Sequence, residues 1–420
     1  MGARKAEGRL WSREFVLLTA IQTIDLFTYN MITPVIAKYA LMQGATLVLA
    51  GVIASAFAFV ALFARPLSGF LSDRLGRRRI VLLSIAVGCL AQVGYALAPG
   101  FGLLIALRAV HGFFYALFGT AISAMALETL PEARRSEGMG WFGTSYVFAN
   151  ALGPALGVFL SGSFGFAAMF FAGAGVAAFS LVLGLFVGTR KAPPPVLPAE
   201  AAHSAPAAET APAAPAAAPA AVAPAAPAAP PARGIARFIS IKSIPLAIAA
   251  CCYLTIWGMI STYIVIVGDL RGVVGISAFF VVNSVTLFFT RPFAGRIADK
   301  CGLSAVFYPS TLFETIGVLI IAFTSNLWLF LLAAVFKAFG SGTVTPSIQA
   351  RCGQLEPPER SGVAMSTYLL GTDIGYTLGP LIGGAVSSAF GFSAMFLSSL
   401  PILAIGVAVY ALWARKQKQA

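Results

Sequence analysis

The stretch Arg65-Pro-Leu-Ser-Gly-Phe-Leu-Ser-Asp73 returns later in the chain as Arg291-Pro-Phe-Ala-Gly-Arg-Ile-Ala-Asp299, at an offset of 226 residues. Two further pairs share this offset. Leu152-Gly-Pro-Ala-Leu-Gly157 matches Leu378-Gly-Pro-Leu-Ile-Gly383, and Gly165-Phe-Ala-Ala-Met-Phe170 matches Gly391-Phe-Ser-Ala-Met-Phe396. Three matches at one offset are hard to obtain by chance. We therefore expect two halves with the same order of elements.

The composition of the 420 residues is that of a membrane protein. Hydrophobic residues make up 59% and charged residues only 10%, and the mean hydropathy is +0.87. Soluble domains average about 25% charged residues, so this chain has too few polar side chains to cover a soluble surface. We therefore expect an all-α integral membrane protein, because Gly-rich and Pro-containing helices are common in such proteins.

Apolar runs of about 20 residues are long enough to cross a hydrocarbon core of ~30 Å. The sequence contains twelve such runs, six in each half. Their approximate limits are 14–38, 47–70, 79–98, 101–125, 138–162, 166–188, 244–268, 274–298, 304–324, 326–348, 362–386 and 391–413.

The meaning of the net charge of +13 depends on where the basic residues lie relative to these runs. With both termini cytoplasmic, most Lys and Arg fall in the tails and cytoplasmic loops, and the outward loops carry only Lys38 and Arg271. This asymmetry is the positive-inside pattern. It predicts a multi-pass protein of the cell (inner) membrane with both termini cytoplasmic, and it explains the basic excess without a nucleic-acid partner.

One segment separates the two halves. Residues 192–232 contain 21 Ala and 12 Pro in 41 positions, a composition typical of an extended, semi-rigid linker. We expect an N-terminal six-helix bundle over residues 1–191, this cytoplasmic linker, and a C-terminal six-helix bundle over 233–420. Two parallel repeats can rock about a site near the membrane midplane and open it to each side in turn.

The loop after the second run reads Gly69-Phe-Leu-Ser-Asp73-Arg74-Leu-Gly76-Arg77-Arg-Arg79 and resembles the signature loop of the major facilitator superfamily. The resemblance implies that superfamily's alternating-access fold over the whole chain apart from the linker. It also implies a cytoplasmic gate, formed by Gly69, Asp73, Arg74, Gly76 and Arg77, that latches the outward-open state. The second copy keeps Gly295, Asp299 and Gly302 but loses the Arg run, so we expect a weaker latch. The alternative is that these charges only set the topology.

Two more segments are similar to motifs of this superfamily. Leu107-Arg108-Ala-Val-His111-Gly112 resembles its second motif, whose buried Arg is associated with proton transfer in proton-coupled members. Gly153-Pro154-Ala-Leu-Gly157 resembles the third motif, which is characteristic of antiporters, although Ala149 and Val158 replace two of its glycines.

The eleventh run, Gly375-Tyr-Thr-Leu-Gly379-Pro380-Leu-Ile-Gly383-Gly384, is closer to the full third motif. Glycine at every fourth position makes a flat seam for a neighbouring helix. The motif favours export over uptake. The alternative is that the motif only allows tight helix packing and gives no information about the direction of transport.

Polar groups inside the apolar runs indicate a transport site, because ionisable residues are costly there and usually face a cavity or a partner. In this superfamily helices 1, 4, 7 and 10 line the central cavity, so the resemblance implies that their polar faces converge. These faces are Gln22, Asp25 and Tyr29; Arg108, His111 and Tyr115; Tyr253 and Trp257; and Lys337, Ser341 and Thr345.

Three other charged positions are open to more than one interpretation. Asp373 in the eleventh run suits a second protonation site, a substrate ligand or a buried carboxylate paired across the interface. For Glu314 a structural role is favoured, because the ninth helix is peripheral in this fold. Arg65 and Arg291 lie near the cytoplasmic ends of their runs, where we expect gate elements.

The central hypothesis is that Asp25 carries the coupled proton while Arg108, together with His111, controls its protonation. Burial favours a neutral acid and a nearby cation favours the carboxylate, so movement between two states can switch the proton. Competition between a proton and a substrate for one buried carboxylate gives antiport. A permanent ion pair of Asp25 with Arg108 or Lys337, which only fixes packing, is the alternative.

Other function classes lack support in the sequence. There is no catalytic constellation of a membrane enzyme, no His/Cys metal cluster and no Gly-rich Lys-Ser/Thr phosphate loop. We expect a secondary transporter without a cofactor, driven by the proton gradient, that works as a monomer and exports a small organic solute such as a drug-like compound or metabolite. Proton-coupled import of a metabolite is the alternative, and a transport-inactive membrane sensor is a more distant one.

The substrate class is less defined. The segment from Leu130 to Gly138, together with the contexts of Arg65 and Arg108, resembles a branch of the superfamily that includes exporters of opine-type metallophores. The mixed charges expected in the cavity suit an anionic or zwitterionic metabolite.

Overall fold

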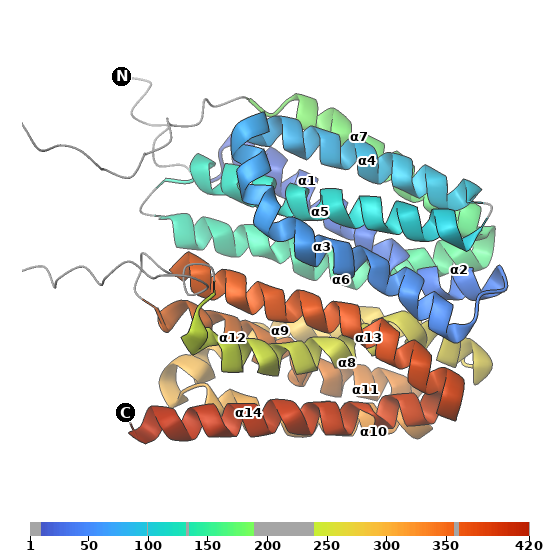
Figure 1. Ribbon diagram of the computed structural model, residues 1–420, viewed down its shortest axis with the longest axis vertical. Coiled ribbons are helices and arrows are strands. Elements are labelled where there is room, and N and C mark those ends of the chain that lie inside the picture. Colours follow the sequence, from blue (N-terminus) through green and yellow to red (C-terminus); the bar gives the residue numbers. More distant parts are fainter. Residues whose placement is uncertain (1–9, 99, 132–133, 189–238, 357–360, 420) are drawn as a thin grey trace, which may run out of the picture.

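The computed structural model describes residues 10–98, 100–131, 134–188, 239–356 and 361–419, and every regular element in these ranges is a helix (Figure 1). The elements are α1 (Arg13–Ile32), α2 (Ile36–Met42), α3 (Leu47–Leu75), α4 (Arg77–Leu97), α5 (Phe101–Thr129), α6 (Arg135–Phe164), α7 (Phe166–Leu185), the short 3-10 helix η4 (Ile241–Ser243), α8 (Ile244–Leu270), α9 (Ala278–Cys301), α10 (Ser304–Phe323), α11 (Leu327–Phe339), α12 (Ser341–Gln354), α13 (Ser361–Leu397) and α14 (Ser399–Gln419). The expected linker, 192–232, lies outside the described residues.

Twelve helical spans within the described ranges are long and apolar enough to cross a membrane. Each overlaps one of the twelve runs read from the sequence, so the prediction of an all-α, twelve-helix membrane fold is confirmed. Three of these spans are interrupted, one of them Val363–Leu397, where Gly391 has non-helical backbone angles near the end of α13. The first breaks between α1 and α2 around Pro34, which has no N–H to donate to a helix, and the tenth breaks between α11 and α12 at Gly340.

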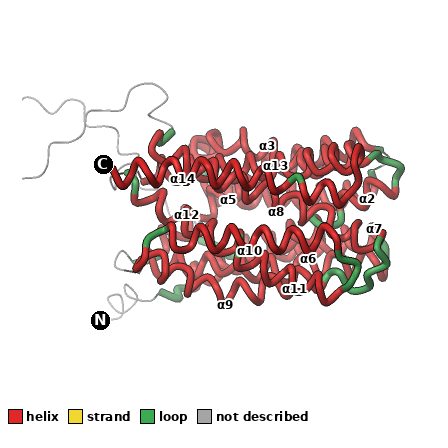
Figure 2. Tube along the Cα trace, turned by 90° about the horizontal axis from the view of Figure 1, so that it is seen from below, coloured by secondary structure: helices red, strands yellow, loops and turns green. Residues whose placement is uncertain are grey.

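The helices form two groups that lie side by side. Helices α1–α7 make up one group and α8–α14 the other (Figure 1), and the helices of both groups run lengthwise along the molecule (Figure 2). The groups meet chiefly where α3 packs against α13 and where α6 packs against α9. A contact surface between two helix groups of this kind is where a transporter built from two parallel repeats places its substrate site.

Four glycines show that the two halves turn in the same way. Gly76 ends α3 with a φ of 89°, and Gly302, 226 residues later, ends α9 with a φ of 82°. Gly165 and Gly391 form a second pair at this offset, with φ values of 86° and 82°. L-residues with a side chain rarely adopt these angles. The repeat seen in the sequence is therefore also present in the backbone.

Close backbone contact joins α3 to α13. A Cβ at Gly51 would lie 2.4 Å from the carbonyl oxygen of Pro380, and one at Gly384 would lie 2.6 Å from that of Leu47. Nearby, the Ser55 hydroxyl donates to the carbonyl of Thr377 at 2.8 Å. Only glycine permits such an approach, so these residues hold the two groups together at this level.

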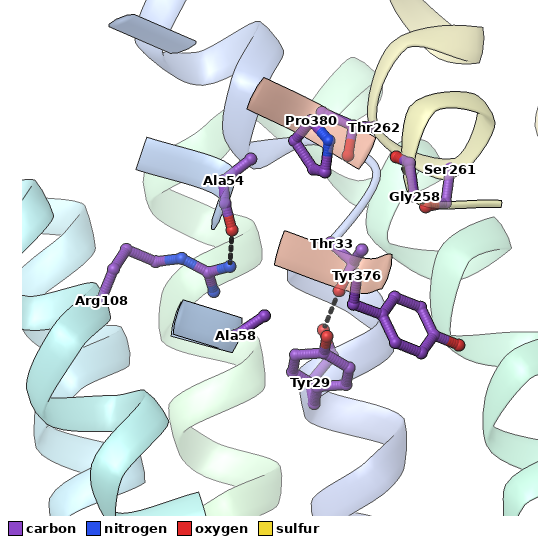
Figure 3. Close-up of a pocket in the computed structure, with 10 residues that line it drawn as sticks. All are labelled: Tyr29, Thr33, Ala54, Ala58, Arg108, Gly258, Ser261, Thr262, Tyr376 and Pro380. Atoms are coloured by element: carbon purple, nitrogen blue, oxygen red, sulfur yellow. Dashed lines mark hydrogen bonds between the residues drawn. The ribbon is translucent and has the colours of Figure 1, made fainter. Parts of the chain in front are cut away.

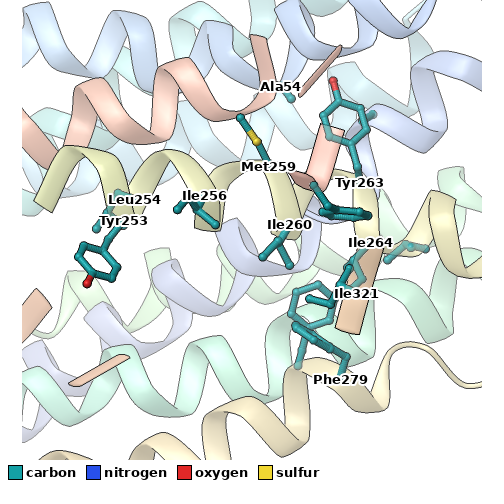
Figure 4. Close-up of a cluster of buried hydrophobic side chains, with 14 of the residues drawn as sticks. Ala54, Tyr253, Leu254, Ile256, Met259, Ile260, Tyr263, Ile264, Phe279 and Ile321 are labelled. Atoms are coloured by element: carbon teal, nitrogen blue, oxygen red, sulfur yellow. The ribbon is translucent and has the colours of Figure 1, made fainter. Parts of the chain in front are cut away.

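Helix α8 lies at the centre of the molecule and is buried along almost its whole length. Its apolar side chains, among them Met259, Ile260 and Ile264, form a cluster with residues of both groups, including Ala54 of α3 and Phe279 of α9 (Figure 4). This cluster fixes the position of α8 beside the polar residues described next.

Candidate functional site

A small pocket lies between the two helix groups, and both contribute to its wall (Figure 3). The lining residues come from α1, α3, α5, α8 and α13. They are Tyr29, Thr33, Ala54, Ala58, Arg108, Gly258, Ser261, Thr262, Tyr376 and Pro380. Two of the polar faces predicted from the sequence meet here, since Tyr29 belongs to the first helix and Arg108 to the fourth.

Arg108 is the charged residue of the pocket wall, and it is only 2% exposed. Its Nη2 donates to the carbonyl of Ala54 at 3.0 Å and its Nε to that of Ile53 at 3.3 Å, while the guanidinium carbon lies 4.7 Å from the centre of the Phe57 ring. The hydroxyl of Tyr95 is also close. The buried Nη1 has no hydrogen-bond partner among the described residues.

Aromatic rings connect the first and fourth helices. Tyr29 stacks on Tyr115 with centroids 4.9 Å apart and on Phe57 at 4.8 Å. On the far side of the interface, the hydroxyls of Tyr146 and Tyr376 lie 2.9 Å apart and join α6 to α13. Rings of this kind provide flat apolar faces with polar edges, which suit an aromatic or cationic ligand.

Asp25 lies one helical turn before Tyr29 and is half-buried. Its Oδ2 is inaccessible to solvent and accepts no hydrogen bond from any group that the structure describes, and the same holds for Oε1 of Gln22. Tyr115 is within electrostatic range of Asp25. Neither of the ion pairs considered from the sequence, with Arg108 or with Lys337, is formed within the described part of the chain. One carboxylate oxygen within a membrane span is thus left without a donor among the described residues.

Asp373 is 8% exposed and pairs with Arg65 across the two groups. The guanidinium is bidentate: Nε donates to Oδ2, and Nη2 donates to Oδ1 at 3.0 Å. This is the interface pairing that the sequence left as one of three interpretations of Asp373. Arg65 is also within electrostatic range of Tyr29 and Tyr115, so the pair borders the aromatic rings.

The polar face expected on the tenth helix lies elsewhere. Lys337 is fully buried and pairs with Glu314 of α10, which is also fully buried. The second oxygen of Glu314 accepts the backbone N–H of Ser341 at 2.8 Å, at the break between α11 and α12. Both residues are absent from the pocket wall, so in this arrangement they stabilise the broken helix.

Two further predicted cavity residues, Tyr253 and Trp257 of α8, also lie off the pocket wall. Tyr253 is fully buried, and its hydroxyl lies 2.6 Å from that of Thr311 in α10 (Figure 4). Trp257 is partly buried against the apolar cluster. The seventh helix instead reaches the pocket through Gly258, Ser261 and Thr262.

His111 contacts the neighbouring helix α4. Its Nδ1 lies 3.0 Å from the Tyr95 hydroxyl, and a Cβ at Gly88 would lie 3.3 Å from its Nε2. Gly88 and His111 correspond to Glu314 and Lys337 by the 226-residue offset. Equivalent positions on neighbouring helices are thus occupied by a glycine and a histidine in the first half, and by a buried ion pair in the second half.

The family model of the Major Facilitator Superfamily matches residues 17–287 and 246–420. The chain belongs to the Major Facilitator Superfamily. It is therefore a multi-pass membrane transporter of that superfamily and not an enzyme, as the sequence indicated.

Relatives and solved structures agree with this assignment. The chain is 23% identical over 399 residues to the multidrug resistance protein MdtG of Escherichia coli O9:H4 (strain HS), covering 92% of this chain and 91% of that protein. It is 22% identical over 334 residues to the multi-drug resistance efflux pump PmrA homolog of Lactococcus lactis subsp. lactis (strain IL1403), covering 80% and 77%.

Among solved structures, a POT family transporter in complex with 5-aminolevulinic acid superposes with a TM-score of 0.75 at 14% identity, covering 96% of each chain. The nucleoside transporter NupG superposes with a TM-score of 0.71 at 11% identity, covering 96% of this chain and 99% of that one. At these identities the likeness concerns the superfamily fold alone.

The superfamily's signature loop is described only in part. The surroundings of Gly69 and the side chains of Asp73 and Asp299 lie outside the description, although the backbones of all three residues continue α3 and α9. Arg77, at the start of α4, pairs with Glu128 near the end of α5. Arg74, Gly295 and both turn glycines, Gly76 and Gly302, are exposed or nearly so at this end of the molecule. A role in gating stays a prediction.

The glycines of the antiporter-like motif lie against the first helix of each half. Cβ atoms at Gly153 and Gly157 would lie 2.9 Å and 2.1 Å from the carbonyl oxygens of Phe27 and Met31 in α1. In the second half, Gly375 and Gly379 meet the carbonyls of Cys251 and Thr255 in α8, and Gly383 meets the Tyr263 ring. Pro154 and Pro380 lie inside α6 and α13.

Sequence reasoning missed several residues that the structure brings to the site: Thr33, Phe57, Tyr146, Ser261, Thr262 and Tyr376. Tyr376 lies inside the glycine motif quoted from the eleventh run, and the glycine spacing gives no reason to single it out. Tyr29, Thr33 and Asp25 share one helical face at spacings of four, so Thr33 could have been found by continuing that face one turn. Within the described residues, no group of three or more His, Cys, Asp or Glu side chains is arranged to hold a metal ion.

Proposed function

We propose that the protein is a proton-coupled antiporter that exports a small organic solute across the cell (inner) membrane, with both termini cytoplasmic and Asp25 as the proton carrier. The observation that carries this proposal is the state of Asp25. Its carboxylate lies within a membrane span, its Oδ2 is buried without a hydrogen-bond partner in the described chain, and Tyr115 is within electrostatic range.

The physical argument is one of charge. A carboxylate in this position is costly when ionised and unpaired, so it binds a proton or a positively charged partner. When a substrate's positive group takes this place, the proton must leave, and the reverse holds when the proton returns. One carboxylate that accepts either occupant couples outward movement of the substrate to inward movement of protons, without a further cofactor.

The arrangement of the helices supports alternating access. We assign residues 1–191 and 233–420 to two bundles, with residues 192–232 as their cytoplasmic tether. Lys38 and Asp269 form an ion pair of 2.5 Å between the bundles at the end opposite to the termini, and Arg65 and Asp373 join them closer to the termini. Rocking must break these two pairs in turn. A single chain contains the whole site, so a monomer suffices.

The direction of transport is supported by relatives that are named as multidrug efflux or multidrug resistance proteins. Untargeted mass spectrometry of cells and medium tests it, comparing wild type, Asp25→Asn and empty vector. A compound that accumulates outside only with wild type supports export. A compound that is instead depleted from the medium makes the protein an importer, and no difference in any host favours a transport-inactive sensor.

Coupling is tested on purified protein in liposomes with an imposed pH gradient. We expect wild type to move the identified compound against its gradient when the compound's destination is acidic. Asp25→Asn should bind and exchange the compound but not respond to the gradient. Glu14→Gln is the matched control, because it neutralises a carboxylate of the same helix at its first turn, away from the proposed site. Normal coupling in Asp25→Asn contradicts the proposal.

A further inference from the structure

Arg108 has an unused donor. Two of its three nitrogens are bound to carbonyls of α3, while Nη1 is buried and has no hydrogen-bond partner in the described part of the chain. Figure 3 shows the guanidinium reaching from α5 toward Ala54 and Ala58 in the pocket wall. An arginine is always charged in proteins, and each of its unsatisfied buried donors costs free energy. A ligand that accepts a hydrogen bond from Nη1 offsets this free-energy cost.

Among the residues that the structure describes, no carboxylate forms an ion pair with this guanidinium. The ion pairs of the described residues place Asp373 with Arg65, Glu314 with Lys337 and Asp269 with Lys38, and none includes Arg108. The pocket wall also contains the hydroxyls of Ser261, Thr262 and Thr33, of which those of Ser261 and Thr33 donate to the backbone carbonyls of Gly258 and Tyr29. A buried positive charge with an open donor in a pocket is the feature that binds an anionic group.

We propose, on the basis of the export function above, that this pocket is an anion subsite and that the substrate is a small aromatic zwitterion. Its anionic group, a carboxylate or a group of similar charge, binds Nη1 of Arg108. Its positive group displaces the proton from Asp25. Its aromatic body lies along the rings of Tyr29 and Tyr115.

The geometry of α1 sets the spacing of the two charges. Asp25, Tyr29 and Thr33 follow each other at intervals of four on one helical face, and Thr33 and Tyr29 line the pocket. With a rise of 1.5 Å per residue, Asp25 lies roughly 6 Å along the axis from Tyr29 and roughly 12 Å from Thr33. A ligand that extends from the pocket wall, where Arg108 lies, to Asp25 therefore spans roughly one to two helical turns and carries its charges at opposite ends of an elongated body.

The zwitterion explains how an anion subsite is compatible with antiport. A simple organic anion binds best when Asp25 is protonated and neutral, and so would travel with the proton. A positive group that replaces the proton reverses this linkage. Arg108 then selects the substrate while Asp25 couples it to the gradient, which are separate tasks for two residues that form no ion pair with each other.

The test compares two probes that differ only at one end. These are 6-(aminomethyl)-2-naphthoate and 6-(aminomethyl)-2-naphthamide, with binding measured by calorimetry on the full chain in detergent. We expect wild type to bind the carboxylate at least about tenfold more tightly than the amide. In Arg108→Gln the ratio should fall to about one with little change for the amide.

A second pair of variants keeps Arg108 and its contacts to α3. Ala58→Glu places a carboxylate of the protein itself beside the guanidinium and should also abolish the ratio, and the equally large, neutral Ala58→Gln measures how much of that loss comes from added bulk in the pocket wall. This pair decides the question if Arg108→Gln does not fold. A wild type that binds both probes equally or neither of them, or an Ala58→Glu variant that keeps the preference, overturns the anion subsite.

The binding assay tests the anion subsite and the transport assay tests the export function, so their outcomes are independent. A tenfold preference for the carboxylate without any pH-driven movement of solutes would leave the subsite in place and overturn the export function. Normal pH-driven export with a ratio of one would do the opposite.

Discussion

Arg65 of α3 and Asp373 of α13 form a bidentate ion pair that joins the two bundles, with Nη2 of the guanidinium 3.0 Å from Oδ1. Asp373 is buried, whereas the Arg65 side chain is 29% exposed. Arg–carboxylate pairs with this fork geometry are stronger and more specific than single contacts. Because the partners belong to different bundles, any rocking that separates α3 from α13 at this level must break the pair.

The first prediction concerns this pair. Asp373→Asn or Arg65→Gln should reduce transport several-fold and shift the protein toward the conformation in which α3 and α13 are separated. The exchange Arg65→Asp with Asp373→Arg should restore part of the activity, because the attraction is recovered with the charges reversed. Spin labels on the described ends of α3 and α13 measure the separation. An unchanged distance distribution in both single variants would show that the pair does not control the opening.

The second prediction concerns the fully buried pair of Lys337 and Glu314. Removing one partner of such a pair leaves an uncompensated charge and costs about 3–5 kcal/mol. We therefore expect Lys337→Met to destabilise the protein strongly and the double variant Lys337→Met, Glu314→Met to be closer to wild type. Thermal unfolding in detergent measures both. Equal losses in the single and double variants would mean that the two charges do not depend on each other.

The contrast between Lys337 and Tyr29 shows how far sequence reasoning reaches. Helical spacing places Tyr29 on the same face as Asp25, and the structure brings that face to Tyr115 of the fourth helix as expected. The spacing of Lys337 and Ser341 also predicts one face, but Gly340 breaks the helix between them. Periodicity identifies which residues of a helix lie together, whereas the rotation of that helix and a break within it depend on tertiary contacts.

The same limit applies to the choice of ionic partners. Twelve spans, two repeats and the glycine seams follow from hydrophobicity and spacing, which are properties of single helices or of an offset. The pairing of Arg65 with Asp373 depends on how α3 lies against α13. Nothing local to either segment specifies it, and the sequence therefore left Asp373 with three interpretations.

The third prediction uses the glycine seam between α6 and α1. Gly157→Ala places a methyl group 2.1 Å from the Met31 carbonyl oxygen, so the helices must move apart. Overpacking of this kind costs about 1–3 kcal/mol. Gly162 in the same helix has no atom within 4 Å of its Cβ position, and Gly162→Ala should be neutral or slightly stabilising because alanine favours helix. Thermal unfolding of the two variants side by side is the measurement, and equal melting temperatures would contradict the close contact.

The last prediction concerns the turn glycines. Gly76 has a φ of 89° and a ψ of 125°, a backbone conformation that is costly for a residue with a side chain, although no atom lies within 4 Å of its Cβ position. Gly76→Ala should therefore destabilise the protein by about 1–3 kcal/mol through backbone strain alone. Gly100→Ala is the control, because Gly100 also has open space around it but an extended backbone with a φ of −178° that any residue adopts. If both variants melt at the same temperature, the backbone conformation at Gly76 does not destabilise a residue with a side chain. If only Gly76→Ala is destabilised, Gly302→Ala should behave in the same way, since it ends α9 with a φ of 82° at the equivalent position of the second half.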